Sequence, residues 1–195
     1  MTRLSGPRLP AAQGHKADRL VVFCHGYGAD GNDLIGLGAQ WQRAMPTTAF
    51  VSPNAPQPCP GSPGYQWFPI SRLDPAEMLK GVQSAAATLD AFLDEELNRL
   101  GLDHSRLALV GFSQGTMMSL HVGLRRKTPP AAILGFSGAL AGPELLPNEA
   151  TGKPKVMLIH GDADQVIPVQ ALFAAAQGLG AAEIPVQWHI SRGIP

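Results

Sequence analysis

The sequence predicts an α/β fold: one domain, residues 1–195, arranged as a three-layer sandwich in which a mostly parallel sheet has helices on both faces. Short apolar runs of strand length alternate along the chain with amphipathic or small-residue segments of helix length. Polar, glycine-rich turns follow several of these runs, as is typical of the carboxyl ends of parallel strands. The 195 residues also suffice to bury a core of ordinary size.

Composition excludes several classes of protein. The 15 Lys and Arg residues balance the 15 Asp and Glu residues, so the net charge gives no reason to expect a nucleic-acid partner. No apolar run approaches the ~20 residues of a membrane span, and the N-terminal segment lacks the apolar core of a secretory signal. Cys24 and Cys59 have no metal-ligand spacing, so we expect free thiols, no metal and a cytoplasmic location.

A central strand is predicted over residues 20–24, which are continuously apolar. The chain then enters His25-Gly26-Tyr27-Gly28, where glycines allow backbone N–H groups to face a cleft. Such a turn also suits a phosphate, but G-x-G-x-x-G is incomplete and there is no Walker lysine. A nucleotide- or phosphate-binding protein is therefore the weaker interpretation. Asn32 or Asp33 is expected to cap the next helix.

A second strand is expected over residues 47–52, and residues 53–70 then form a loop too rich in proline and glycine for regular structure. A loop of this length in a compact domain commonly lines a site. Trp67 and Phe68, near its end, either pin the loop to the core or form an apolar wall for a substrate. We assign both residues to substrate binding as the functional prediction.

The second half of the chain continues the alternation of strands and helices. Asp74 is a well-formed helix cap, with Pro75 in the first turn and Glu77 three residues after the cap, and Gly101 is expected to end this helix. Further strands are expected over 107–110, 131–136, 155–160 and 185–190, with another helix over 168–179.

The stretch from Gly111 to Gly115 has the pattern G-x-S-x-G, between a predicted buried strand and a helix-like segment. In that setting Ser113 is a candidate nucleophile, held in strained backbone geometry with its hydroxyl above the sheet. The two glycines are needed because a Cβ at either position would collide with the neighbouring strand and helix. The alternative is that Ser113 merely caps the next helix.

A serine hydroxyl needs a base, usually a histidine that a carboxylate holds in the correct tautomer. Asp162 and Asp164 both follow the predicted strand over 155–160 and compete for the role of that carboxylate. Asp162 falls where a turn former is wanted, which favours Asp164. Alternatively, both residues serve only to make the turn and to cap the next helix.

An oxyanion hole needs two N–H donors aimed at the developing negative charge. We expect one to be the backbone N–H of Gln114, directly after the nucleophile, and the other to be that of Tyr27 in the loop after the first central strand. His25 then braces this loop and is not the catalytic base.

Together, HGYGAD, GFSQG and HGDADQVIP resemble the phospholipase/carboxylesterase family of α/β hydrolases, which includes acyl-protein thioesterases, and the likeness covers nearly the whole chain. The resemblance implies the α/β-hydrolase fold, with Ser113 as nucleophile, Asp164 as acid, and the Tyr27 and Gln114 amides as oxyanion hole. It implies hydrolysis of small carboxylic esters, thioesters or lysophospholipids without metal or cofactor, and a possible homodimer. A hydrolase-like binding protein without catalysis is the alternative.

The catalytic histidine is the point at which the sequence departs from the family pattern. The family places it after the last strand in a turn that here begins at Gly193 and reaches Pro195. We therefore expect the histidine immediately after Pro195, in a domain cut short at its C-terminus, and a final helix beyond it that covers the sheet. His189 is expected to occupy a position within the last strand.

Overall fold

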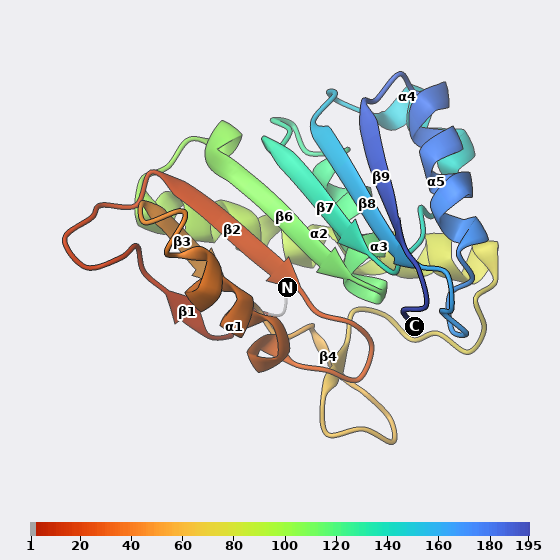
Figure 1. The fold of residues 1–195 in the computed structure, drawn as a ribbon, viewed down its shortest axis with the longest axis horizontal. Helices are drawn as coiled ribbons and strands as arrows, with labels where there is room; N and C mark the ends of the chain where they lie inside the picture. The colour runs from red at the N-terminus through yellow and green to blue at the C-terminus, as the bar shows by residue number, and fades with distance from the viewer. Residues whose placement is uncertain (1–2) are drawn as a thin grey trace.

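The computed structural model describes residues 3–195, and within them a seven-stranded sheet runs in the order β1-β3-β2-β6-β7-β8-β9 (Figure 1). Its strands are β1 (Arg8–Leu9), β2 (Arg19–Cys24), β3 (Thr48–Val51), β6 (Leu107–Phe112), β7 (Ala132–Phe136), β8 (Lys155–Gly161) and β9 (Val186–Ser191). All neighbours are parallel except β1, which pairs antiparallel with β3. The predicted mostly parallel sheet is confirmed, whereas β1 is too short to show a periodicity in the sequence.

The helices are α1 (Gly31–Trp41), α2 (Pro75–Leu100), α3 (Gln114–Gly123), α4 (Leu146–Glu149) and α5 (Gln170–Ala181), with 3-10 turns at His104–Arg106 and Pro143–Leu145. Helix α2 begins and ends as predicted, with Asp74 as its cap and Gly101 in the left-handed conformation, φ 64°. The predicted cap of α1 is wrong by two or three residues. Asp30 is extended and accepts the N–H of Asn32 at 2.7 Å, so the helix already begins at Gly31.

The loop over residues 53–70 contains a short hairpin that was not predicted. Within it, β4 (Gln57–Pro58) pairs antiparallel with β5 (Tyr65–Gln66). The N–H of Gly28 donates to the carbonyl of Tyr65 at 2.8 Å, and the N–H of Tyr65 donates to the carbonyl of Ala29 at 2.7 Å. The hairpin is thus ordered by pairing with the turn after β2. The composition of the loop itself gives no sign of this pairing.

Helices lie on both faces of the sheet, as predicted, but they are unequally distributed (Figure 1). Helices α2, α3 and α5 pack on one face around the main hydrophobic core, and every residue of α3 is buried. Helix α1 packs on the other face, where a smaller apolar cluster forms around Phe23, Phe50 and Val110. Among residues 3–195, no helix has both the length and the hydropathy that crossing a membrane requires.

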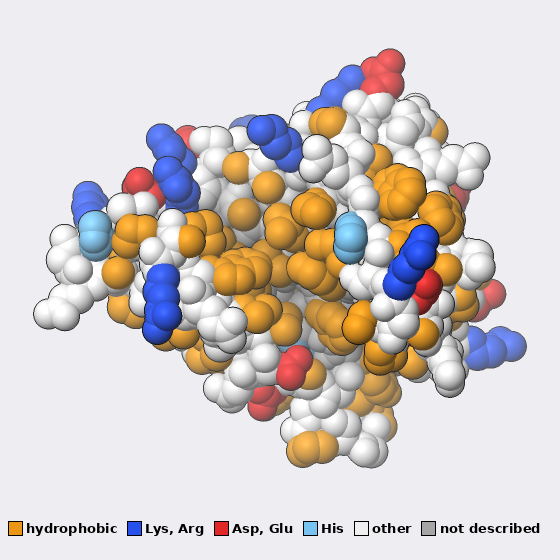
Figure 2. Space-filling model, in the orientation of Figure 1, with side chains coloured by type: hydrophobic (Ala, Val, Ile, Leu, Met, Phe, Trp, Pro, Cys, Tyr) orange, Lys and Arg blue, Asp and Glu red, His pale blue; other side chains and the backbone are white. Residues whose placement is uncertain are grey.

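The face that carries α1 is left open beyond β6. The strand register places Phe112, Phe136 and Ile159 in one row across this face, with Leu134 and Met157 in the next. Phe112 is 44% exposed and Met157 37% exposed. Figure 2 shows hydrophobic side chains gathered in the middle of this face. Within residues 3–195, no helix covers this part of the sheet.

Candidate active site

The turn between β6 and α3 holds Ser113 in the strained geometry that the G-x-S-x-G pattern predicts. Ser113 has φ 54° and ψ −117°, a backbone conformation that costs a non-glycine residue free energy. Its N–H donates to the carbonyl of Phe136 at 2.8 Å, which ties the turn to the neighbouring strand β7. Its side chain makes no capping hydrogen bond to α3, so the helix-cap alternative is wrong.

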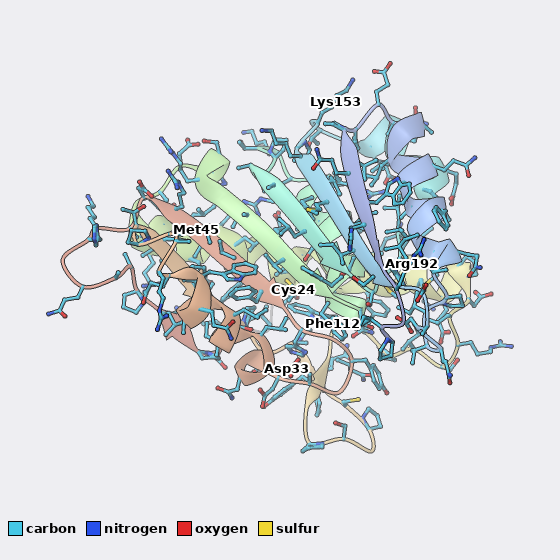
Figure 3. The ribbon with its side chains drawn as sticks, viewed as in Figure 1. Cys24, Asp33, Met45, Phe112, Lys153 and Arg192 are labelled. Carbon is cyan, nitrogen blue, oxygen red and sulfur yellow. The ribbon has the colours of Figure 1, made fainter. Side chains whose placement is uncertain are left out.

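The two glycines of the motif are required for close packing. A Cβ on Gly111 would lie 2.4 Å from the carbonyl oxygen of Gly115, inside the first turn of α3. A Cβ on Gly115 would lie 1.9 Å from the carbonyl oxygen of Cys24, at the end of β2. Cys24 and Phe112 mark these neighbouring strand ends in Figure 3. The serine therefore lies where β2, β6 and the start of α3 come together.

Gln114 connects the nucleophile turn to the loop before α2. Its side chain is buried, its Oε1 accepts the N–H of Trp67 at 2.8 Å, and its Nε2 donates to the carbonyl of Phe68 at 2.8 Å. Because Gln114 is the first residue of α3, its backbone N–H belongs to the helix-initial donors that have no partner within the helix. This N–H is the donor that we predict for the oxyanion hole.

His25 braces the loop after β2, as predicted. The residue is fully buried, its Nδ1 lies 2.7 Å from the carbonyl oxygen of Gly26, and its Nε2 accepts the N–H of Ala55 at 3.0 Å. Since Nε2 accepts a hydrogen bond, Nδ1 must carry the proton, and the imidazole is neutral. The carbonyl of His25 accepts the indole N–H of Trp67 at 2.9 Å. The loop with Tyr27 is thereby fixed to the core.

Two buried histidines make stability depend on pH. Burial lowers the pKa of His25, and burial together with the nearby Arg125 lowers the pKa of His121 to about 4. The unfolded chain, with histidine pKa values of about 6.5, therefore takes up protons first. The stabilisation is complete above pH ~6.5 and is lost as the pH falls through the folded-state values.

We expect the free energy of unfolding to fall between pH 7 and pH 4, with His121 accounting for up to about 3 kcal/mol of the loss. Urea unfolding at a series of pH values measures this. His121→Gln should flatten the acid limb of the curve, and His15→Gln, at an exposed position, should not. Identical slopes for wild type and His121→Gln would contradict the assignment.

A cavity of about 290 Å³ lies beside Ser113. Its walls are mainly apolar and come from three segments: Ile70 and Leu73 before α2, Met117 on α3, and Val166 with Ile167 after β8. Tyr27 and Gln114, the two residues predicted to form the oxyanion hole, line the cavity together with Ser113. The predicted nucleophile and oxyanion-hole residues therefore share one cavity.

Trp67 and Phe68 do not line this cavity, and their assignment to substrate binding is corrected. Both side chains are fully buried, and the Cβ position of Gly81 on α2 lies 2.2 Å from the Phe68 ring. They pin the loop to the core, which is the alternative that the sequence left open. The wall residues Ile70 and Leu73 were not predicted. They follow Trp67 and Phe68 along the chain and belong to no motif.

The turn after β8 separates the two competing aspartates. Asp162 is exposed, and its Oδ1 accepts the N–H of Gly193 at 2.6 Å, which makes it a turn-forming residue. Asp164 has a side chain only 10% exposed, and its Oδ1 accepts the N–H groups of Val166 and Ile167. The second oxygen of Asp164 lies 3.4 Å from Nε2 of the buried His160.

The end of the chain lies against the same turn (Figure 1). The N–H of Ala163 donates to the carbonyl of Ile194 at 3.1 Å, and a Cβ on Gly161 would lie 2.1 Å from that same oxygen. The end of the chain is therefore held against Ala163, the residue that precedes Asp164. Nε2 of His160 donates to the carbonyl of Ile167 at 2.8 Å, and His189 lies within β9 opposite Ile159.

A sharp turn that places a serine above the carboxyl edge of a mostly parallel sheet defines the class of α/β hydrolases, and this chain has that fold. Residues 11–194 match the phospholipase/carboxylesterase family. The chain therefore belongs to this family and is a hydrolase of that class.

Known proteins with similar sequences and structures agree with this membership. Acyl-protein thioesterase 1 of Gibberella zeae is 29% identical over 95% of this chain and 85% of its own length. Acyl-protein thioesterase 1 of Yarrowia lipolytica is 30% identical over 82% and 74%. The crystal structure of esterase PE8 superposes with a TM-score of 0.94 at 48% identity, over 98% of this chain and 90% of that one. These similarities support an enzyme and not a hydrolase-like binding protein.

Proposed function

We propose that the protein hydrolyses carboxylic esters or thioesters, lysophospholipids included, through an acyl-enzyme on Ser113. The observation that carries this proposal is the strained backbone of Ser113, which places the residue at the edge of an apolar cavity. The esterase and thioesterase names of the similar proteins support the same substrate class. Small acyl esters and thioesters are the partners that this chemistry requires.

In the proposed reaction, Ser113 Oγ attacks the carbonyl carbon and its proton passes to a histidine. The backbone N–H groups of Gln114 and Tyr27 receive the negative oxygen of the tetrahedral intermediate. The C–O or C–S bond then breaks, and the leaving group takes the proton from the histidine. A water molecule then attacks the acyl-enzyme by the same steps and releases the carboxylic acid. Asp164 orients the imidazole and stabilises its protonated form.

The base in this scheme is a histidine that directly follows Pro195 in the full-length protein. The hydrogen bonds of Gly193 to Asp162 and of Ile194 to Ala163 support it, because they hold Gly193 and Ile194 beside the turn that carries Asp164. His25 is engaged with the backbone of Gly26 and Ala55, and Nε2 of the buried His160 is already taken up by the carbonyl of Ile167. The coding sequence beyond Pro195 tests this part of the proposal, and a frame with no histidine within a few residues would exclude it.

Covalent labelling tests the proposed nucleophile directly. A fluorophosphonate probe reacts with a serine that is activated by a base, so the full-length protein should be labelled on the peptide that contains Ser113. Mass spectrometry of the digested adduct identifies the modified residue. A label on another serine, or no label on a folded protein, would argue against an acyl-enzyme at this position.

We further propose a cytoplasmic location and assembly into a homodimer. The thiols of Cys24 and Cys59 are both free and buried, as suits a reducing compartment. Exposed Phe173 and Trp188, in contact at the free edge of the sheet, are suited to a subunit interface. Cell fractionation and sedimentation velocity measure these two properties, and a secreted or strictly monomeric protein would contradict them.

A further inference from the structure

Arg72 is the charged residue among those that line the cavity beside Ser113. The other walls are aliphatic or aromatic, or belong to the nucleophile turn. Arg72 is exposed, so its guanidinium lies at the mouth of the cavity, where it is permanently charged and offers five N–H donors in a planar fork that matches a carboxylate or phosphate. The position of this charge at the rim therefore bears on which esters enter the cavity.

The backbone that carries Arg72 is held by Glu77 on the first turn of α2. The two oxygens of Glu77 accept the N–H and the hydroxyl of Ser71, at 2.8 and 2.9 Å, and the N–H of Arg72, at 2.9 Å. These hydrogen bonds, first of all that from the Ser71 backbone, lower the pKa of Glu77 and keep it ionised. A charged tether thus fixes the segment at the cavity rim.

The guanidinium of Arg72 is not used in this tether. Glu77 is its acidic neighbour, but the carboxylate is directed at backbone N–H groups and the Ser71 hydroxyl. In the described part of the chain, no ion pair within 4.0 Å involves Arg72. The five N–H donors of its side chain are therefore available to an anion at the mouth of the cavity.

We infer that Arg72 determines substrate specificity by binding a negatively charged group, so that the favoured substrates are esters or thioesters with an anionic group a few bonds from the reacting carbonyl. This inference rests on the proposed function. The apolar cavity receives the hydrocarbon part, and Arg72 binds a carboxylate or similar anion at the rim, either at the end of the acyl chain or on the leaving group.

The test compares kcat/KM for paired esters with the full-length protein. One pair has the same aryl leaving group and either an ω-carboxyl or a neutral acyl chain of equal length. The second pair has the same short acyl group and either a carboxylated or an unsubstituted phenol. Arg72→Gln should lower kcat/KM for the anionic member of one pair by about fivefold more than for its neutral partner, the size expected for an exposed charge pair.

Two control variants and a salt series sharpen the comparison. Arg72→Lys keeps the positive charge and should retain part of the preference, whereas Arg43→Gln removes an exposed arginine away from the cavity and should change nothing. The preference of the wild type should also weaken as ionic strength rises. Which pair responds tells whether the anion lies on the acyl group or on the leaving group.

The outcomes separate this inference from the function on which it rests. Hydrolysis of both members of each pair, with no change of their ratio in Arg72→Gln, would overturn the role of Arg72 and leave the hydrolase intact. Hydrolysis of none of these esters, together with no fluorophosphonate label, would overturn the proposed function and this inference with it.

Discussion

Replacing Ser113 by alanine should lower kcat for a short-chain aryl ester by about a million-fold in the full-length protein. The loss is large because the acyl-enzyme cannot form. Without the serine hydroxyl, the histidine and the aspartate of the triad have no nucleophile to activate. The donors of the oxyanion hole and the binding cavity should leave a residual rate of roughly 10³–10⁴ over the uncatalysed reaction. Release of the coloured phenol, followed under saturating substrate, measures both quantities.

The alanine variant should keep its fold, which separates loss of chemistry from loss of structure. The Ser113 backbone is fixed by its hydrogen bond to Phe136, and the side chain contributes no cap to α3. Thermal unfolding should therefore change little. Ser105→Ala, at an exposed position in a 3-10 turn, is the matched control and should keep full activity. Unchanged hydrolysis in Ser113→Ala would refute the proposed nucleophile.

Replacing Asp164 by asparagine should lower kcat by about 10⁴. An amide can still accept the N–H groups of Val166 and Ile167, so the turn should keep its shape. The amide cannot stabilise a protonated imidazole, and it favours the wrong tautomer of the histidine. Steady-state kinetics should show this loss in kcat with little change in KM, because the carboxylate acts in the transition state.

Asp162→Asn is the matched control for the acid. Its amide oxygen can still accept the N–H of Gly193, so the end of the chain should stay in place and the rate should fall far less than in Asp164→Asn. A larger loss in Asp162→Asn than in Asp164→Asn would reverse the assignment of the two aspartates. Equal and small losses would exclude a catalytic carboxylate on this turn.

The sequence predicted correctly which residues lie at the ends of the strands, but it did not predict which residues form the cavity wall. Ser113 and Asp164 each lie in a short local motif after a buried strand, so their positions at the carboxyl edge of the sheet follow from the strand pattern alone. The buried Trp67 and Phe68 are instead bonded through their backbone to the side chain of Gln114, which accepts the N–H of Trp67, donates to the carbonyl of Phe68 and is far away in sequence. No local pattern reports such a contact.

The same distinction explains the other differences. The pairing of Tyr65 with the turn at Gly28 orders a hairpin in a loop whose composition opposes regular structure. Glu77 lies three residues after the cap Asp74, and its carboxylate accepts the N–H groups of Ser71 and Arg72, which precede the helix. In both examples the observed partner of a polar group does not follow from the composition of the segment.

The paired hydrogen bonds of Gln114 to Trp67 and Phe68 divide the loop before α2 into a part anchored at the nucleophile turn and a part that lines the cavity. Up to Phe68 the loop is anchored to the residue that follows the nucleophile, and from Ile70 onwards it forms the cavity wall. Substitutions at Ile70 or Leu73 should therefore reshape the cavity without displacing Ser113. For directed evolution of substrate range, these two positions form a small library that leaves the reaction centre untouched.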